Sequence, residues 1–268
     1  KARVQQCKKI ELPARRGSIL DRNGNTLAES LRVASIYADP AEVEDVRAVS
    51  NQLSRVLKIN SPKIAKLLNK GKRFVWIKRR IGADELIAVS KLSLKGIYTT
   101  CEYHRFYPRK QLASHILGFT DIDGKGLEGI ELLFDNTLSG EAGYKLVYRD
   151  ALQRPIATPD AEVTLPKHGN GVMLTIDANI QRFAEEELEA ACMKWEPLSA
   201  TAVVMDPMTG EVLAMANYPS YDPNHFMKYP LKNRRNFAVT DCYEPGSVMK
   251  PIIISGVFEQ GLVRPDNV

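Results

Sequence analysis

Residues 243–251 read Tyr243-Glu-Pro-Gly-Ser247-Val-Met-Lys250-Pro251 and contain the pair of side chains best suited to nucleophilic catalysis. A serine and a lysine three positions apart on a helix lie on the same face, so the amine can reach the hydroxyl. A serine nucleophile needs such a base to accept its proton. The Pro-Gly pair predicts a sharp turn before Ser247, and Pro251 requires the helix to begin close to that serine. Unpaired N–H groups at such a helix start favour a developing oxyanion.

The Ser-x-x-Lys spacing alone carries little information. The chain holds 14 serines and 19 lysines among 268 residues, so about one such pair is expected by chance, and one is found. By itself the pair is more simply explained as a helix-capping serine followed by a surface lysine. The segments around it therefore decide the interpretation.

The segments just upstream predict a helix and a strand hairpin. Residues 200–205 and 211–216 are apolar runs on either side of Asp206-Pro-Met-Thr-Gly210, which predicts strand, turn and strand. Residues 172–176 predict a further strand, and Asp177 is the expected N-cap of the helix that follows it. That helix is expected to bury Ile180, Phe183, Ala184, Leu188 and Ala191 and to hold Glu185, Glu186, Glu187 and Glu189 on a solvated face.

The first 160 residues predict a strand-rich region with short helices. Asn23-Gly24 favours a tight hairpin between residues 18–20 and 26–28. Apolar spacings of three and four predict two helices within 41–69, the second with Ser61 as N-cap and Pro62 as its first residue, and a third helix over 83–92. Residues 96–119 are expected to be extended and 130–138 to form a short helix.

The polar segment 161–171 has the proline and glycines of a linker. We therefore expect it to separate a domain over residues 1–160 from a second domain over residues 172–268.

Composition argues against several classes of function. The 37 basic and 32 acidic residues are mixed along the chain, so the net charge of +5 gives little support for nucleic-acid binding. The four cysteines are far apart and have no histidine at ligand spacing, so we predict no metal, no cofactor and no disulfide framework. No run of about 18 apolar residues is present, so no membrane span is expected within these residues.

Several segments together carry a family resemblance. Residues 241–251 resemble the first active-site motif of class B penicillin-binding proteins, and the hairpin at 203–216 and the segment 218–224 resemble the opening of their transpeptidase domain. Residues 16–28, 105–119 and 126–131 resemble the three motifs of the family's non-catalytic pedestal. The resemblance spans nearly the whole chain. It departs at Lys110, where relatives often carry glycine, so we expect a different turn there.

The resemblance implies an α+β fold: a strand-rich N-terminal pedestal with short helices, followed by the incomplete start of a penicillin-binding transpeptidase α/β domain. It implies Ser247 as the acyl nucleophile and Lys250 as the general base. The pedestal residues that it singles out are Arg16, Gly17, Asp21, Arg22, Gly24, Arg105, Tyr107, Pro108, Gly126, Glu128, Gly129 and Glu131. Their mixture of arginines, carboxylates and glycines predicts ion pairs that tie the segments together, with a partner-binding surface as the alternative.

The implied function is that of a peptidoglycan D,D-transpeptidase, which cross-links stem peptides through an acyl-serine intermediate and is acylated by β-lactams. Residues 235–246 resemble the cell-division (septal) subgroup more than the elongation subgroup. The implied partners are the peptidoglycan stem peptide, β-lactam antibiotics, a membrane-embedded glycosyltransferase and divisome proteins. The implied location is the extracytoplasmic (periplasmic) side of the bacterial cytoplasmic membrane, with the N-terminal anchor outside this chain.

Two further pieces of a penicillin-recognising site, a Ser-x-Asn triplet and a Lys-Thr-Gly triplet, do not occur in the 268 residues. In the family both lie well downstream of the nucleophile, so we expect the chain to be truncated after Ser-x-x-Lys and to be inactive by itself. Two alternatives remain open. One is a scaffold whose pedestal docks a partner of the wall-synthesis complex. The other is a β-lactam sensor or serine β-lactamase, against which the pedestal motifs argue.

Overall fold

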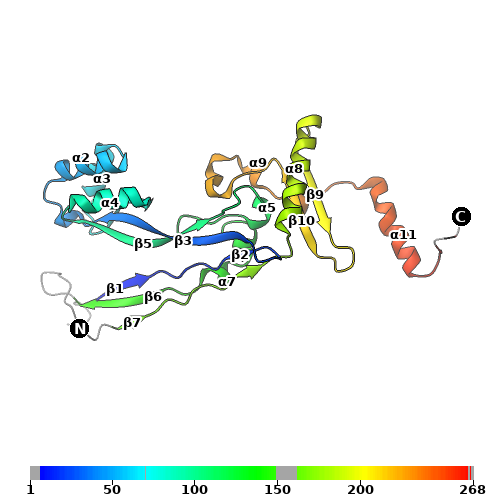
Figure 1. The fold of residues 1–268 in the computed structure, drawn as a ribbon, viewed down its shortest axis with the longest axis horizontal. Helices are drawn as coiled ribbons and strands as arrows, with labels where there is room; N and C mark the ends of the chain where they lie inside the picture. Colours follow the sequence, from blue (N-terminus) through cyan, green and yellow to red (C-terminus); the bar gives the residue numbers. More distant parts are fainter. Residues whose placement is uncertain (1–6, 70, 149–161, 265, 267–268) are drawn as a thin grey trace.

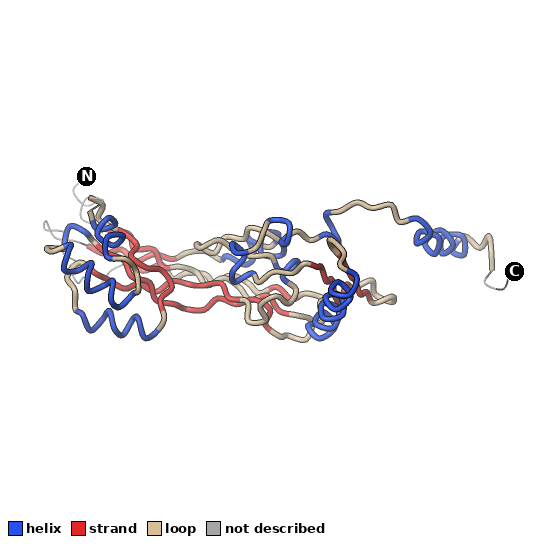
Figure 2. The backbone as a smooth tube through the Cα atoms, turned by 90° about the horizontal axis from the view of Figure 1, so that it is seen from above, coloured by secondary structure: helices blue, strands red, loops and turns tan. Residues whose placement is uncertain are grey.

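The computed structural model describes residues 7–69, 71–148, 162–264 and 266 of the chain. The molecule is elongated, with a group of helices at one end, long strands along its length and a single helix that stands apart near the C-terminus (Figure 1). A view turned by 90° shows the same separation of the last helix (Figure 2). The fold is α+β, as predicted from the sequence.

Strand β3 (Thr26–Ala38) is the backbone of the main pedestal sheet. It pairs antiparallel with β4 (Val75–Ile81) and, over ten residues from Glu29↔Phe106 to Ala38↔Ile97, with β5 (Ile97–Phe106). The predicted hairpin at Asn23-Gly24 is confirmed, because β2 (Ile19–Leu20) pairs antiparallel with the start of β3 and Gly24 has a φ of +82°. The predicted strand over 172–176 is shorter than expected, since β8 is Val172–Met173, and it runs parallel to β2.

The helices at one end of the molecule cover one face of this sheet. They are α2 (Val46–Leu57), α3 (Ser61–Leu68) and α4 (Ala83–Leu92), preceded by the short 3-10 helix η1 (Pro40–Glu42). Their apolar faces close a core with the sheet, and its fully buried members include Ile36, Leu53 and Ile64. The predicted N-cap of α3 is wrong by one residue. Asn60 precedes the helix, while the Ser61 hydroxyl donates to the Asn51 side chain at 2.6 Å instead of capping.

A second pedestal sheet is formed by strands from distant parts of the sequence. Its strands are β1 (Cys7–Leu12), β6 (Gly143–Tyr148) and β7 (Val163–Thr164), in the order β1-β6-β7. Strand β7 and Lys167, which forms a bridge with Glu141, belong to the segment expected to be a linker, and both are hydrogen-bonded to the pedestal. The division of the chain at 161–171 stays a prediction, and residue 161 lies outside the described residues.

The predicted extended structure over residues 96–119 is correct only as far as Phe106. After Pro108 the chain turns, because Lys110 and Ala113 have φ values of +53° and +55°. The glycine-poor turn at Lys110 therefore adopts the left-handed conformation that glycine favours. The short helices that follow are α5 (Ser114–Leu117), α6 (Gly129–Leu133) and α7 (Asp135–Ser139). The single helix predicted over 130–138 is thus two helices that meet at Phe134.

The second part of the chain begins with a helix on a hairpin. Helix α8 (Ala178–Trp195) has Asp177 as its N-cap, as predicted, and packs on the antiparallel strands β9 (Ala200–Met205) and β10 (Val212–Tyr218). The predicted buried face of α8 is partly wrong: Phe183 is 56% exposed and Ala191 is exposed, whereas Gln181 and Cys192 are buried. The remaining short elements are η2 (Pro223–Lys228), α9 (Leu231–Arg234), α10 (Phe237–Thr240), η3 (Gly246–Met249) and α11 (Lys250–Glu259). Among the described residues, no helix is both long and apolar enough to cross a membrane.

Candidate functional site

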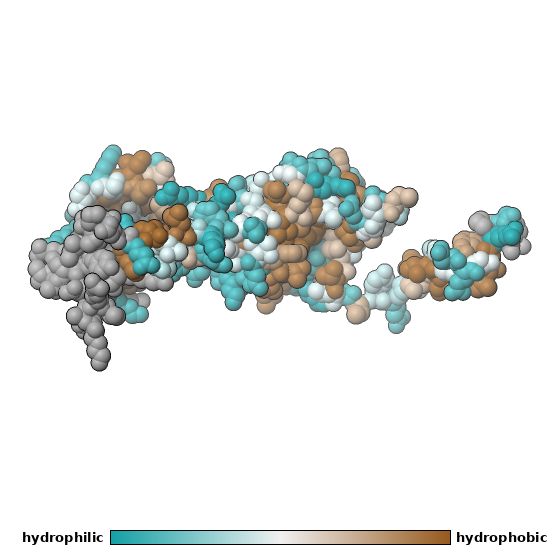
Figure 3. Space-filling model, turned by 90° about the horizontal axis from the view of Figure 1, so that it is seen from below, coloured by the Kyte–Doolittle hydropathy of each residue, from teal (hydrophilic) through white to brown (hydrophobic). Residues whose placement is uncertain are grey.

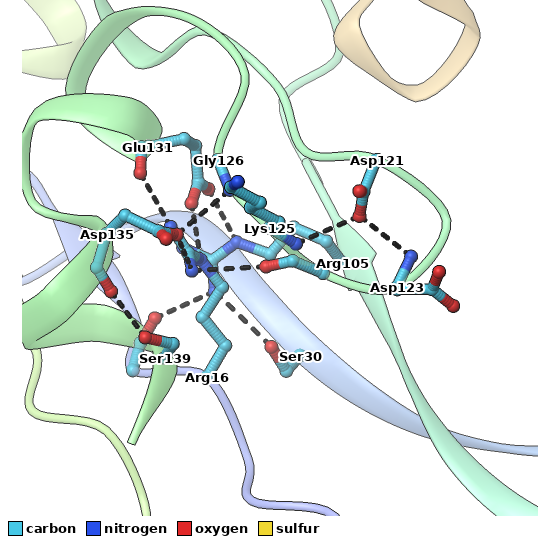
Figure 4. Close-up of polar contacts among 12 residues, drawn as sticks. Arg16, Ser30, Arg105, Asp121, Asp123, Lys125, Gly126, Glu131, Asp135 and Ser139 are labelled. Atoms are coloured by element: carbon cyan, nitrogen blue, oxygen red, sulfur yellow. Dashed lines mark hydrogen bonds and ion pairs between the residues drawn. The ribbon is translucent and has the colours of Figure 1, made fainter. Parts of the chain in front are cut away.

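A buried cluster of charged side chains joins several segments of the pedestal (Figure 4). Arg16 Nε donates to Glu131 Oε2 at 2.7 Å, and Arg105 Nε donates to Glu131 Oε1 at 2.6 Å. The Glu131 side chain is fully buried, and both guanidinium groups are nearly so. Because ion pairs of this kind have a defined geometry, a single carboxylate fixes the relative positions of three segments that are far apart in the sequence.

Neighbouring polar groups extend this cluster. Asp135 Oδ1 accepts from Arg16 Nη1 at 2.6 Å and from the Gly126 amide at 2.9 Å. The Tyr107 hydroxyl donates to Glu131 Oε1 at 3.2 Å. Burial by itself raises the pKa of Asp135, but the hydrogen bonds from Gly126 and Arg16 outweigh it and hold the pKa below the ordinary value.

Backbone packing around the cluster leaves no room for larger side chains. A Cβ atom on Gly126 would lie 2.0 Å from the Glu131 carbonyl oxygen, and Gly129 has a φ of +61° beside the main chain of Gly118. Gly17 is enclosed in the same way by Asn170, and its carbonyl accepts from Arg105 Nη1 at 2.7 Å. These glycines allow the segments to approach closely enough for the ion pairs to form.

Asp21 organises the hairpin turn and connects it to the second part of the chain. Its fully buried carboxylate accepts from the Asn23 and Asn25 amides at 2.9 and 2.7 Å and from the Ala178 amide at the start of α8 at 3.3 Å. Burial alone raises the pKa of Asp21, yet a hydrogen bond from the Asn25 side chain at 2.9 Å, together with those from the three amides, holds the pKa below its ordinary value. Arg22 beside it forms an exposed ion pair with Glu211 at 3.3 Å.

The remaining pedestal residue with an ionisable side chain, Glu128, lies outside the Glu131 cluster. Burial raises the pKa of its carboxyl group, and the charge that opposes this shift belongs to Arg234 of α9. Pro108 stands where β5 has ended and the turn begins. Among the residues that the structure describes, no three His, Cys, Asp or Glu side chains are grouped closely enough to hold a metal ion.

Ser247 and Lys250 lie in the turn that leads into α11. Gly246 has a φ of +55°, Ser247 belongs to the 3-10 turn η3, and the Lys250 amide donates to the Ser247 carbonyl as the α-helix begins. Pro251 is the second helical residue, where its missing N–H loses no intrahelical hydrogen bond. The helix therefore begins close to Ser247, as predicted, with Ser247 in a 3-10 turn that leads directly into the α-helix at Lys250.

The surroundings of Ser247 and Lys250 differ from those of the pedestal cluster. Both side chains are exposed, and within the described part of the chain neither hydroxyl nor amine has a hydrogen bond to the other. Every residue of α11 except Val257 is exposed, including Ile252, Ile253 and Ile254. The apolar surface of this isolated helix is visible in the space-filling view (Figure 3). The described residues thus place the pair on one turn but supply no burial around it.

The structure also reveals contacts that the sequence patterns did not indicate. The fully buried Tyr221 hydroxyl donates to the Ser114 carbonyl at 2.9 Å. The Asn224 side chain accepts from the Tyr107 amide and donates to the Tyr107 carbonyl, both at 3.0 Å. Segment 218–224 was noted only as part of the family resemblance. Its sequence carries two Pro-flanked turns and no signal of a partner 117 positions away.

Glu185 is the clearest error of the sequence interpretation. Instead of facing solvent with Glu186 and Glu189, its carboxylate accepts from the Ala113 amide of the pedestal at 2.8 Å. A carboxylate in a run of three glutamates resembles an ordinary solvated helix face, so only the packed structure identifies it.

Comparison with known proteins accounts for both parts of the chain. Residues 11–174 match the sequence profile of the "Penicillin-binding Protein dimerisation domain". Residues 200–268 match that of the "Penicillin binding protein transpeptidase domain".

Curated relatives agree with these matches. The chain is 40% identical over 255 residues to the probable peptidoglycan D,D-transpeptidase PenA of Neisseria meningitidis, covering 93% of this chain and 44% of the relative. It is 37% identical to the peptidoglycan D,D-transpeptidase FtsI of Escherichia coli, covering 99% of this chain and 45% of the relative. The chain therefore spans under half the length of the curated relatives that it matches.

Solved structures show the same fold. A peptidoglycan synthetase from Bifidobacterium adolescentis matches 98% of this chain and 53% of its own with a TM-score of 0.67 and 27% identity. The complex of PBP2 with MreC from Helicobacter pylori matches 97% of this chain and 54% of its own with a TM-score of 0.74 and 24% identity, which bears on the fold alone. The profile of the dimerisation domain covers more than half of the chain and the transpeptidase profile follows it, so the chain belongs to the class B penicillin-binding protein family.

Proposed function

We propose that the whole protein is a peptidoglycan D,D-transpeptidase of cell division, with Ser247 as nucleophile and Lys250 as general base. Ser247 Oγ attacks the penultimate D-Ala carbonyl of a stem peptide while the Lys250 amine accepts the hydroxyl proton. The C–N bond to the terminal D-Ala breaks, and this D-Ala leaves with a proton on its new amine. An amine of a neighbouring stem peptide then attacks the acyl ester, forms the cross-link and restores the serine.

The observation that carries this proposal is the position of the Ser-x-x-Lys pair in the fold. After the hairpin β9–β10, Ser247 lies in the 3-10 turn η3 and Lys250 begins helix α11, both within the residues that match the transpeptidase domain. The pedestal argues against the sensor or β-lactamase alternative, because residues 11–174 match the dimerisation domain of penicillin-binding proteins. The names of the relatives supply the substrate, peptidoglycan, and the reaction class.

A transfer assay on the whole protein tests the assignment of the two residues. With a substrate that ends in D-Ala-D-Ala, Ser247→Ala is expected to lose at least about 10³-fold in kcat, and Lys250→Arg about 10²- to 10⁴-fold. Ser255→Ala is the matched control, since Ser255 lies on the helix that Lys250 begins and its hydroxyl donates to the Pro251 carbonyl. Full transfer by Ser247→Ala would assign the nucleophile elsewhere.

We further propose that the protein acts on the periplasmic side of the cytoplasmic membrane, where its polymeric substrate lies. β-Lactams would acylate Ser247 as analogues of the D-Ala-D-Ala end.

A second role, docking of a protein partner, is favoured by a groove in the pedestal. The groove holds about 850 Å³ between β1 and the sheet of β3, β4 and β5. Its walls include exposed apolar side chains, Ile10, Phe74 and Ile122, beside the charged Arg79 and Glu102. We propose that it receives a membrane-associated protein of the division complex, with a glycosyltransferase as the leading candidate. The similar PBP2 of Helicobacter pylori is described in a complex with MreC.

Pulldown from membranes distinguishes this role from catalysis. Phe74→Asp in the whole protein is expected to lose the partner and retain transfer activity in the purified state. Leu133→Asp, at an exposed apolar residue that does not line the groove, is the control. Undiminished capture by Phe74→Asp would refute docking in the groove.

A further inference from the structure

Glu185 lies on α8 and faces the pedestal. Its Oε1 accepts two hydrogen bonds, from the Ala113 amide at 2.8 Å and from Gln181 Nε2 at 2.6 Å. Ala113 belongs to the pedestal turn before α5, whereas Gln181 lies one helical turn before Glu185. One carboxylate oxygen therefore joins the two parts of the chain.

Gln181 carries the connection onward to the hairpin. It is fully buried, its Oε1 accepts from the Met215 amide at 2.7 Å, and its Nε2 donates to the Met215 carbonyl at 3.0 Å. The Gln181 side chain thus forms hydrogen bonds with both the amide and the carbonyl group of Met215 on β10. The hydrogen bonds form a continuous path from Ala113 through Glu185 and Gln181 to Met215.

The pedestal end of this path is a strained residue. Ala113 is buried and has a φ of +55°, a conformation that is unfavourable for any residue with a Cβ atom. Its amide would be a buried donor without a partner if Glu185 were absent. The Glu185 carboxylate on α8 thus provides the hydrogen-bond acceptor that the Ala113 amide needs while this turn keeps its left-handed conformation.

The same turn receives the chain that leaves the hairpin. Tyr221 donates to the Ser114 carbonyl, and Asn224 pairs with Tyr107 at the other end of the turn. The segment that leads from β10 toward Ser247 therefore begins in contact with the same pedestal turn to which Glu185 is hydrogen-bonded.

We propose that Glu185 is a positioning residue that fixes the hairpin β9–β10 on the pedestal turn through Gln181, and thereby sets where the nucleophile-bearing segment starts. The inference concerns the placement of these elements and does not depend on the proposed transpeptidase reaction. None of the family motifs recognised in the sequence includes Glu185 or Gln181.

The protonation state of Glu185 supports this role. Burial raises the pKa of its carboxyl group to about 7, with Glu186 and Glu189 adding to the shift and the hydrogen bonds from Gln181 and Ala113 opposing it. Arg182 on the same helix and Arg109 of the pedestal turn line the small pocket beside it. Because the folded pKa lies above the ordinary value of 4.5, burial of Glu185 costs more free energy as pH rises from that value toward 7, so the packed arrangement is most stable with Glu185 protonated.

Amide hydrogen exchange of the 268-residue chain tests the proposal at both ends of the path. Glu185→Gln keeps an acceptor oxygen in place, whereas the near-isosteric Glu185→Met removes it. In Glu185→Met we expect exchange of the Ala113 and Met215 amides to accelerate at least about tenfold, and in Glu185→Gln to change less than about threefold. Glu186→Met, at an exposed residue paired with Arg182, is the matched control.

Unchanged protection of Ala113 and Met215 in Glu185→Met would overturn the proposal, as would equal losses in the Met and Gln variants. If Glu185→Met does not fold, the unaltered chain still decides the question. Its protection at Ala113, corrected for intrinsic exchange, should fall at least about tenfold from pH 5 to pH 8, and Glu185→Gln should abolish this dependence. The same pH dependence in both proteins would refute a role for the Glu185 carboxyl. None of these measurements requires enzymatic activity, so a failed transfer assay leaves them unaffected.

Discussion

The Glu131 cluster and the Ser247–Lys250 turn both consist of polar or charged motif residues, but the first is buried and the second is exposed. Glu131 is fully buried and is held by two arginines, a tyrosine and closely packed glycines. Ser247 and Lys250 are exposed where the turn η3 leads into α11, a helix that stands apart from the rest of the molecule. Charged and polar motifs thus support the fold where other segments enclose them. Where nothing in the described chain encloses them, they have the spacing of a catalytic pair without its environment.

The largest effect is expected from removing the carboxylate at the centre of the cluster. Glu131→Leu leaves two buried guanidinium groups without their shared partner, so the free energy of unfolding should fall by about 3–5 kcal/mol. Urea denaturation measures the loss. Glu141→Leu is the control, because Glu141 forms an exposed pair with Lys167 and should change stability by less than about 1 kcal/mol. Equal losses in the two variants would show that burial does not distinguish these pairs.

A smaller effect is expected at the turn that Asp21 organises. Because the folded pKa of Asp21 is lowered, its carboxylate stabilises the fold above the ordinary pKa near 3.8, and this contribution disappears as pH falls through the folded value. Asp21→Asn should cost about 1–3 kcal/mol at pH 7 and should reduce the acid-induced loss of stability below about pH 4. Unfolding curves from pH 7 to pH 3 check both effects. An Asn variant with the stability and acid profile of the unaltered chain would contradict them.

The junction between the two parts of the chain should respond still less. Asn224→Ala removes the two hydrogen bonds to Tyr107, and the expected cost is about 1–2 kcal/mol. Asn224→Asp loses the donor to Tyr107 and also places a carboxylate beside Asp222, to which the Asn224 side chain donates at 2.8 Å, so at neutral pH it should be no more stable than the alanine variant. Differential scanning calorimetry gives the order of the three proteins, and any other order would contradict the paired geometry.

The smallest effect is expected on the isolated helix. Ile252 is exposed, so Ile252→Ser should change the stability of the 268-residue chain by less than about 0.5 kcal/mol. Leu138→Ala, at a fully buried residue of the pedestal, should cost about 2–5 kcal/mol. Thermal unfolding of the two variants therefore sharpens the contrast between the enclosed and the open region. A large loss for Ile252→Ser would indicate that α11 packs on the molecule.

Local patterns were sufficient for the elements whose signals are local. The Asn23-Gly24 hairpin, helix α4 and the hairpin around Asp206–Gly210 were predicted because turn residues and apolar periodicity act over a few positions. The segment after Pro108 was not, since Ala113 takes a left-handed conformation that its contact with Glu185 compensates. The sequence likewise predicted an exposed Glu185, because the contact that buries it is not local. Its partner lies 72 positions earlier, and no pattern on its own helix encodes that contact.

The motif residues of the pedestal could be selected from the sequence, whereas their geometry could not. The resemblance singled out Arg16, Arg105 and Glu131, and the structure brings these three together. It also singled out Glu128, which lies outside this cluster and whose pKa is raised by burial and lowered in part by the charge of Arg234. Which carboxylate receives the arginines depends on the close approach of backbones at Gly126 and Gly129, a tertiary feature.

The most direct test of the account is covalent labelling by a fluorescent penicillin, followed by peptide mapping. In the whole protein we expect one label per molecule on Ser247, and none in Ser247→Ala. The 268-residue chain, in which this serine is exposed in the turn before an isolated helix, should remain essentially unlabelled under the same conditions. Labelling of the whole protein at another residue would contradict the assignment of the nucleophile, and stoichiometric labelling of Ser247 in the 268-residue chain would contradict the claim that its surroundings complete the site.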